Sequence, residues 1–110
     1  MNRTDEQSCL DAVHEALQVI GGKWSFSVIS QLYYGPRRFN QLRRNLHGIS
    51  IKSLTETLRH LEQHDIVHRR VIPTVPVSVE YSLTEKGKDY RTVLLQMRQW
   101  GERWTPAPKE

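Results

Sequence analysis

Residues 37–72 read RRFNQLRRNLHGISIKSLTETLRHLEQHDIVHRRVI and combine two amphipathic helix patterns with a basic strand pattern. Apolar residues recur at helical spacing on both sides of a tight turn at His47 and Gly48. Ser50 follows the turn and is a good N-cap for the second helix. The stretch therefore predicts a helix-turn-helix over about residues 39–63, with a strand after it.

Positive charge gathers in the same stretch. Residues 37–70 hold eight of the sixteen Lys and Arg residues and only three acidic ones, a net charge of +5. Residues 1–36 carry −2 and residues 71–110 carry +1. A solvated basic face on a three-helix core is the simpler alternative. The turn, the cap and the clustered charge together favour a polyanionic partner, and we expect nucleic acid.

The length and composition suit one domain without a disulfide framework. The chain has 110 residues and a single cysteine. No apolar run reaches the length of a membrane span, and the N-terminus is too polar for a signal peptide, so we expect a cytoplasmic protein with no membrane partner. We divide the chain into a flexible tail at 1–8, one domain at 9–104 and a second tail at 105–110.

Strand and helix patterns complete the expected fold. Apolar and polar residues alternate up to residue 83, which predicts a two-stranded β-hairpin wing over about 67–83. Ser8 and Asp11 fit a capping box at the start of the first helix, and Thr84 caps a last helix over about 85–104. The predicted fold class is α+β, mostly α: a winged helix-turn-helix with N- and C-terminal dimerisation helices.

The two terminal helices carry apolar stripes that favour a homodimer interface over an aromatic ligand pocket. The residues expected in this interface are Leu10, Val13, Leu17, Val93, Met97, Trp100 and Trp104.

The second helix of the helix-turn-helix has the chemistry to read DNA. The major groove admits one α-helix, and residues near the N-terminus of that helix contact base edges. The expected base-reading residues are Lys52, Ser53, Thr55, Glu56 and Arg59. The residues expected to contact phosphates, or to lie in the wing, are Arg38, Arg43, Arg44, Ser50, Arg69, Arg70, Thr74 and Ser78.

Motifs along residues 9–104 resemble the HxlR family of bacterial transcriptional regulators. They include Cys9, Gly21-Gly22-Lys23-Trp24, Gly35-Pro36-Arg37-Arg38-Phe39, Gly48-Ile49-Ser50 and Val79-Glu80-Tyr81-Ser82-Leu83-Thr84. The resemblance implies a winged-helix homodimer on a double-stranded DNA operator, with dimer contacts from the first and last helices. It also implies an N-terminal cysteine that senses oxidants or electrophiles.

The chain departs from the family pattern at three places. Leu10 and Ile51 stand where the family often has proline, and Ser78 stands where it often has arginine. The last departure removes the arginine that the wing would insert into a minor groove.

Cys9 is the candidate redox sensor. We place it in the first turn of the first helix, where free backbone N–H groups and the helix dipole favour the reactive thiolate. Asp11 opposes this effect, and an inert packing residue is the alternative. A resolving thiol must come from another subunit or a small molecule, because the chain has no second cysteine.

No residue pattern indicates catalysis, a metal site or a cofactor. His60, His64 and His68 recur every four residues, but His68 is expected on a strand and no further ligand completes a set. We therefore expect a sequence-specific transcriptional regulator, not an enzyme, acting as a homodimer on an inverted-repeat operator and switched by Cys9. The alternatives are a small-molecule-responsive repressor with an idle cysteine and a winged-helix protein-interaction module.

Overall fold

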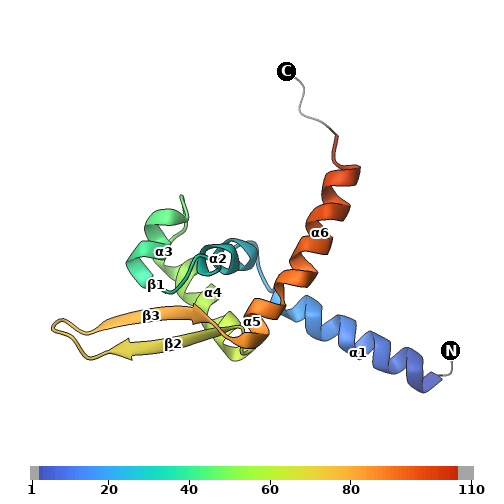
Figure 1. Cartoon of the computed structure of the whole chain (residues 1–110), viewed down its shortest axis with the longest axis horizontal. Coiled ribbons are helices and arrows are strands. Elements are labelled where there is room, and N and C mark those ends of the chain that lie inside the picture. Colours follow the sequence, from blue (N-terminus) through green and yellow to red (C-terminus); the bar gives the residue numbers. More distant parts are fainter. Residues whose placement is uncertain (1–2, 107–110) are drawn as a thin grey trace.

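A computed structural model describes residues 3–106 of the chain, with side chains from Asp5 onward. In order, the elements are α1 (Arg3–Val19), α2 (Ser25–Leu32), β1 (Arg37–Arg38), α3 (Phe39–Asn45), α4 (Ile51–Gln63), β2 (Val67–Ile72), β3 (Ser78–Leu83), α5 (Glu85–Asp89) and α6 (Arg91–Trp104). Figure 1 shows a central body of α2, α3, α4 and the sheet, from which α1 and α6 project. The predicted fold class, a mostly helical α+β winged helix-turn-helix, is confirmed.

The core of the body lies where the helices meet the base of the sheet. Its fully buried members on α2 and α4 recur at helical spacing, as the apolar stripes predicted. The buried apolar side chains from these elements and α3 are Val28, Ile29, Leu32, Leu42, Leu54, Leu58 and Leu61. Tyr81 and Leu83 from β3 close the core from the sheet side.

The turn between α3 and α4 has the predicted chemistry. Gly48 adopts φ of +85°, a left-handed conformation in which glycine carries no steric penalty. The Ser50 hydroxyl accepts a hydrogen bond from the Ser53 backbone N–H at 3.0 Å and caps α4. At the other end Asp65, with φ of +57°, terminates the helix and turns the chain into β2.

The wing contains one more strand than the sequence predicted. The antiparallel sheet has the order β1-β3-β2, and β1 consists only of Arg37 and Arg38. Two residues are too short to produce an alternating pattern, so no sequence signal identified this strand. Pairing with β3 ties the start of α3 to the wing.

Three predictions about the terminal helices were wrong. Residues 3–8 of the predicted flexible tail belong to a helix, because α1 begins at Arg3. Residues 1–2 of that tail lie outside the described residues. Asp5 and Glu6 in the first turn of α1 complement the helix dipole. Ser8 therefore lies inside the helix and cannot cap it. The single helix over 85–104 is divided at Tyr90 into α5 and α6.

The helix break follows from the way the chain packs at Tyr90. Thr84 caps α5 as predicted, because its hydroxyl accepts a hydrogen bond from the Gly87 N–H at 3.0 Å. Tyr90 is buried, and its hydroxyl donates to the Ala16 carbonyl of α1 at 2.6 Å. After this anchor, α6 leaves the body, and the predicted C-terminal tail begins at Thr105. Residues 107–110 of that tail lie outside the described residues.

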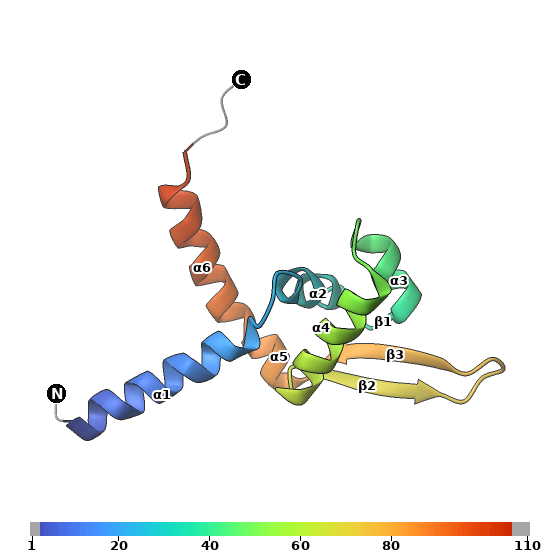
Figure 2. The ribbon, with the colours of Figure 1, turned by 180° about the vertical axis from the view of Figure 1, so that it is seen from behind.

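The projecting helices expose their apolar stripes. Figure 2 shows α1 and α6 diverging from the body on the side away from the wing. Leu10 and Leu17 on α1 are 53% and 57% exposed, and Trp100 and Trp104 on α6 are 64% and 68% exposed. Val13 and Met97 are about half exposed, and only Val93 of the predicted interface residues packs partly against the core. These stripes therefore lack a partner within the described part of the chain.

Candidate nucleic-acid interface

The outward face of α4 presents a polar stripe at the side opposite the core. Lys52, Glu56 and Arg59 are exposed there, while Ser53 and Thr55 on its flanks are partly buried. The stripe exists because Leu54, Leu58 and Leu61 hold the other face of the helix against the core. All five predicted base-reading residues thus lie on one helix, with the three longest side chains free in solvent.

Ile51 is a candidate contact that the sequence reasoning missed. It is the first residue of α4 and is 53% exposed. Apolar side chains at this end of a recognition helix can contact the methyl group of thymine. The available signal was its position directly after the Ser50 cap, at the start of the predicted helix.

A groove separates the start of α3 from the tip of the wing. Its volume is about 760 Å³, and it brings together Arg38, Arg44, Thr74 and Ser78, four of the predicted phosphate or wing residues. The Thr74 hydroxyl donates to the Pro76 carbonyl at 2.9 Å and lies 3.5 Å from the Ser78 hydroxyl. Asn40 also lines the groove, and sequence patterns gave no reason to select it.

The register of the sheet separates the two wing arginines. Arg69 pairs with Tyr81, and Arg70 pairs with Glu80. Successive residues of a strand point to opposite faces, so these arginines lie on different faces of the wing. On the other side of β3, Arg38 also pairs with Glu80. Arg70 therefore shares its face with the groove residue Arg38, whereas Arg69 shares the face of Tyr81.

The arginines predicted to contact phosphates also extend along α3. Arg43 and Arg44 are exposed in its last turn, and with Asn40 they line a separate shallow depression. Ser50 is exposed, but its hydroxyl is already engaged in capping α4. The candidate interface therefore consists of the α4 stripe, the α3 cations, and the wing groove with Arg70.

The comparisons with known proteins agree with this geometry. The model of the HxlR-like helix-turn-helix family matches residues 19–109. The chain belongs to this HxlR-like family. The HTH-type transcriptional regulator YybR of Bacillus subtilis is 47% identical over 90 residues, which cover 82% of this chain and 72% of YybR. This HxlR-like chain is a DNA-binding winged-helix transcriptional regulator.

Solved structures of the regulators HypR and YodB share the fold. The redox regulator HypR in its oxidised form superposes with a TM-score of 0.75 at 44% identity, covering 87% of this chain and 99% of HypR. The reduced form of YodB from B. subtilis gives a TM-score of 0.77 at 34% identity, covering 99% of each chain. YodB has also been determined after diamide treatment.

The cysteine of this HxlR-like protein lies farther along its helix than predicted. Cys9 is exposed and is the seventh residue of α1, so the first-turn placement was wrong. The free backbone N–H groups belong to the first turn of α1, and Cys9 lies beyond that turn. The start of the helix therefore gives no reason to expect a reactive thiolate at Cys9. Cys9 lies 40° around the helix from Val13, at the edge of the exposed apolar stripe.

Side chains from the body bind the last turn of α1. Its final carbonyls lack partners within the helix. The Ala16 carbonyl accepts from the Tyr90 hydroxyl, and the Gln18 carbonyl lies 2.7 Å from Nε2 of His60. A carbonyl can only accept, so Nε2 of His60 carries the proton in this contact. α1 is thereby joined directly to α4, the helix with the exposed polar stripe.

Gly21 permits the contact between α1 and α4. A Cβ atom at this position would lie 2.4 Å from Nε2 of His60. Burial raises the pKa of the Tyr90 hydroxyl, which keeps the second anchor protonated as a donor. No sequence pattern indicated these contacts, because the partners are 42 and 74 residues apart.

Neither a metal site among the histidines nor a helix that could span a membrane is found in the described part of the chain. The rings of His60 on α4 and of His64, which follows the end of α4, lie 4.6 Å apart, whereas His68 lies on β2, as predicted. Over residues 3–106, no group of three or more His, Cys, Asp or Glu is arranged to hold a metal ion. Within the same range, no helix has both the length and the apolar character to cross a bilayer.

Proposed function

We propose that this protein regulates transcription as a homodimer that places α4 of each subunit in a major groove of an inverted-repeat operator. The observation that carries the proposal is the exposed Lys52, Glu56 and Arg59 stripe on a helix capped by Ser50. Lys52 and Arg59 can donate to guanine, Glu56 can accept from cytosine, and Ser53 and Thr55 can contact bases or phosphates. The protein would act in the cytoplasm, on the DNA.

Exposed apolar surface supports the homodimer. Four large apolar side chains, Leu10, Leu17, Trp100 and Trp104, are more than half exposed on helices that project away from the body. Exposed apolar stripes of this kind mark interaction sites, and a closed two-fold dimer is the commonest way to cover them. Two recognition helices about 34–36 Å apart would then match half-sites one helical turn apart.

We assign the contacts with DNA phosphates to Arg38, Arg43, Arg44 and Arg70, and to Thr74 and Ser78 at the wing tip. The shared face of Arg38 and Arg70, and the position of Arg38 in the lining of the groove, support this set. Glu80, paired with both arginines, lies between them in the sheet, where its negative charge can offset the repulsion between the two guanidinium groups. Arg69 has the weakest support, because it lies on the other face.

The dependence of operator affinity on salt concentration tests the proposed contacts with DNA phosphates. Four arginines in each subunit make eight phosphate contacts in a dimer, and we expect operator affinity to fall by about 10³ to 10⁵ between 50 and 200 mM salt. The operator would first be selected from a random DNA pool, and its binding then measured by fluorescence anisotropy at several KCl concentrations. A flat response over this range would contradict the proposed contacts.

We further propose that oxidation of Cys9 changes operator binding. HypR is a redox regulator, and the exposed thiol of Cys9 lies at the edge of the proposed dimer surface. In the oxidation step two thiols lose two protons and two electrons to the oxidant and form one disulfide bond. The second sulfur comes from Cys9 of the partner subunit or from a low-molecular-weight thiol. The hydrogen bond between His60 of α4 and the Gln18 carbonyl joins the end of α1 to α4, so a shift of α1 on oxidation can change the position of α4.

Diamide treatment of wild type and Cys9→Ser tests the redox proposal. The wild-type operator affinity should change on oxidation and return with dithiothreitol, whereas the serine variant should not respond. A non-reducing gel identifies whether the second sulfur belongs to the partner subunit. If both proteins respond identically to diamide, Cys9 is not the sensor.

A further inference from the structure

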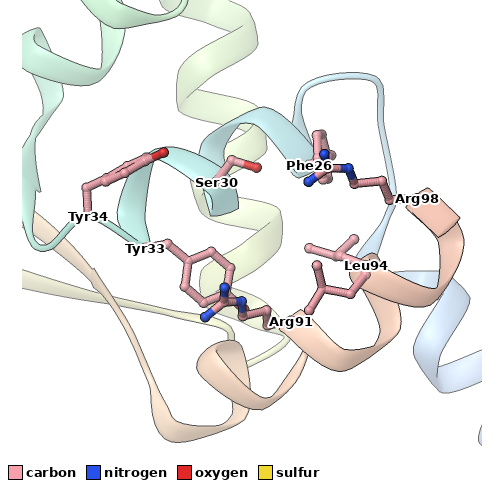
Figure 3. A pocket seen from close by; sticks show the side chains of 8 residues that line it. Phe26, Ser30, Tyr33, Tyr34, Arg91, Leu94 and Arg98 are labelled. Carbon is pink, nitrogen blue, oxygen red and sulfur yellow. The ribbon is translucent and has the colours of Figure 1, made fainter. Parts of the chain in front are cut away.

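A second cavity lies away from the candidate nucleic-acid interface, between α2 and α6. It has a volume of about 360 Å³. Phe26, Tyr33 and Tyr34 form an aromatic wall from α2 and the turn after it, and Leu94 and Leu95 of α6 face this wall. Figure 3 shows the labelled side chains on both sides of the opening. The size lies within the range of small-molecule sites, which are mostly apolar with a few oriented polar groups.

The charged groups of this cavity are both cationic. Arg91 and Arg98 project from α6, and no acidic residue lines the cavity. Arg98 is held by Glu102, with Nε 2.7 Å from the carboxylate oxygen. The Arg91 guanidinium lies 5.4 Å from the centre of the Tyr33 ring and forms no ion pair with the side chains that the structure describes, those of residues 5–106. Arg91 therefore offers an available guanidinium beside an aromatic wall.

The position of Tyr33 is also restricted. Its hydroxyl donates to the Lys88 carbonyl at 3.0 Å, which holds the ring between α2 and α5. With this hydroxyl occupied, the ring presents its apolar surface and supports Arg91 from one side. A planar anion can then meet the fork of N–H donors on Arg91 while its apolar part contacts the wall.

We propose that the cavity between α2 and α6 binds a small aromatic carboxylate. The carboxylate pairs with Arg91, which can donate two parallel hydrogen bonds, and the ring lies among Phe26, Tyr34 and Leu95. Desolvation of the aromatic ring supplies the apolar share of the binding free energy.

The cavity joins two parts of the molecule with different roles. α2 belongs to the body that holds α4, whereas α6 belongs to the proposed dimer surface. A ligand that contacts both helices favours one angle between them and so changes the separation of the two recognition helices. This consequence rests on the proposed homodimer and operator binding, and its size is limited by the difference in ligand affinity between the two arrangements.

The test is a titration of the full chain with 1-naphthoate, in which isothermal titration calorimetry measures the binding. The protein concentration is one at which sedimentation shows the dimer. The neutral analogue 1-naphthalenemethanol is the matched ligand. We expect naphthoate to bind at least tenfold more tightly than the alcohol, and Arg91→Gln to remove that preference. Ser30→Phe, which fills the cavity and leaves both arginines in place, should weaken binding of both ligands.

Control variants separate this site from the DNA interface. Arg59→Gln should weaken operator binding and leave naphthoate affinity unchanged, whereas Arg91→Gln should leave operator binding unchanged in the absence of ligand. Equal affinity for the acid and the alcohol would overturn the proposal, as would a wild-type dimer that binds neither because a partner subunit fills the cavity. Naphthoate binding is measured without DNA, so its result does not depend on whether the proposed operator binding is correct.

Discussion

The variant Lys52→Ala/Arg59→Ala is expected to lose most of its operator affinity. Both side chains are exposed on the outward face of α4, and loss of a base contact at either costs about 1–3 kcal/mol. The residues lie two helical turns apart, a separation of about 10 Å, so their effects should add. The combined loss is about 2–6 kcal/mol, or roughly 30-fold to 10⁴-fold in affinity.

Fluorescence anisotropy on the selected operator, and on a scrambled duplex of the same length, measures the effect. A control variant, Lys23→Ala/Lys88→Ala, removes the same charge from positions outside α3, α4 and the wing. It should retain nearly wild-type affinity. Normal operator binding by the Lys52 and Arg59 variant would remove α4 from the recognition role, whereas equal losses in both variants would indicate an effect of net charge alone.

Gly87→Ala is expected to destabilise the fold by about 3 kcal/mol, at the upper end of overpacking effects. Gly87 is buried in α5, and an added Cβ would lie 2.2 Å from the Ile66 carbonyl oxygen. That oxygen also accepts hydrogen bonds from the Thr84 N–H and hydroxyl. The clash is with backbone, so relief requires α5 to move away from the base of the wing.

Urea unfolding followed by circular dichroism gives the free energy of unfolding for this comparison. Gly22→Ala is the matched control, because an added Cβ there would have no heavy atom within 4 Å. It should change stability by less than about 1 kcal/mol. If Gly87→Ala unfolds at the same urea concentration as Gly22→Ala, the close approach of α5 to Ile66 is not required for stability.

The helix-turn-helix was predictable because its signals are local. The apolar spacing of α4, the turn at Gly48 and the hydroxyl of Ser50 act over a few residues, and each has the predicted role. Thr84 also caps a helix as predicted. In contrast, Ser8 and Asp11 matched a capping box by chance within a helix that had already begun, so Cys9 was misplaced.

The candidate interface was predictable in its residue types but not in its grouping. The sequence indicated that Arg69 and Arg70 belong to the wing, but the pairing with Tyr81 and Glu80 places them on opposite faces. Arg38 and Ser78, forty residues apart, line one groove only because β1 joins the sheet. Such groupings depend on register between distant segments, and a one-residue shift would reverse every face.

By itself, the sequence determined that this chain is a basic winged helix-turn-helix with apolar terminal helices and one cysteine. Those features follow from periodicity, capping and composition, which short stretches of chain carry on their own. Only the tertiary structure decided that Tyr90 and His60 bind the end of α1, and that Arg91 faces an aromatic wall across a cavity. These contacts join residues that are distant in sequence, and they form only when the packed core brings the helices together.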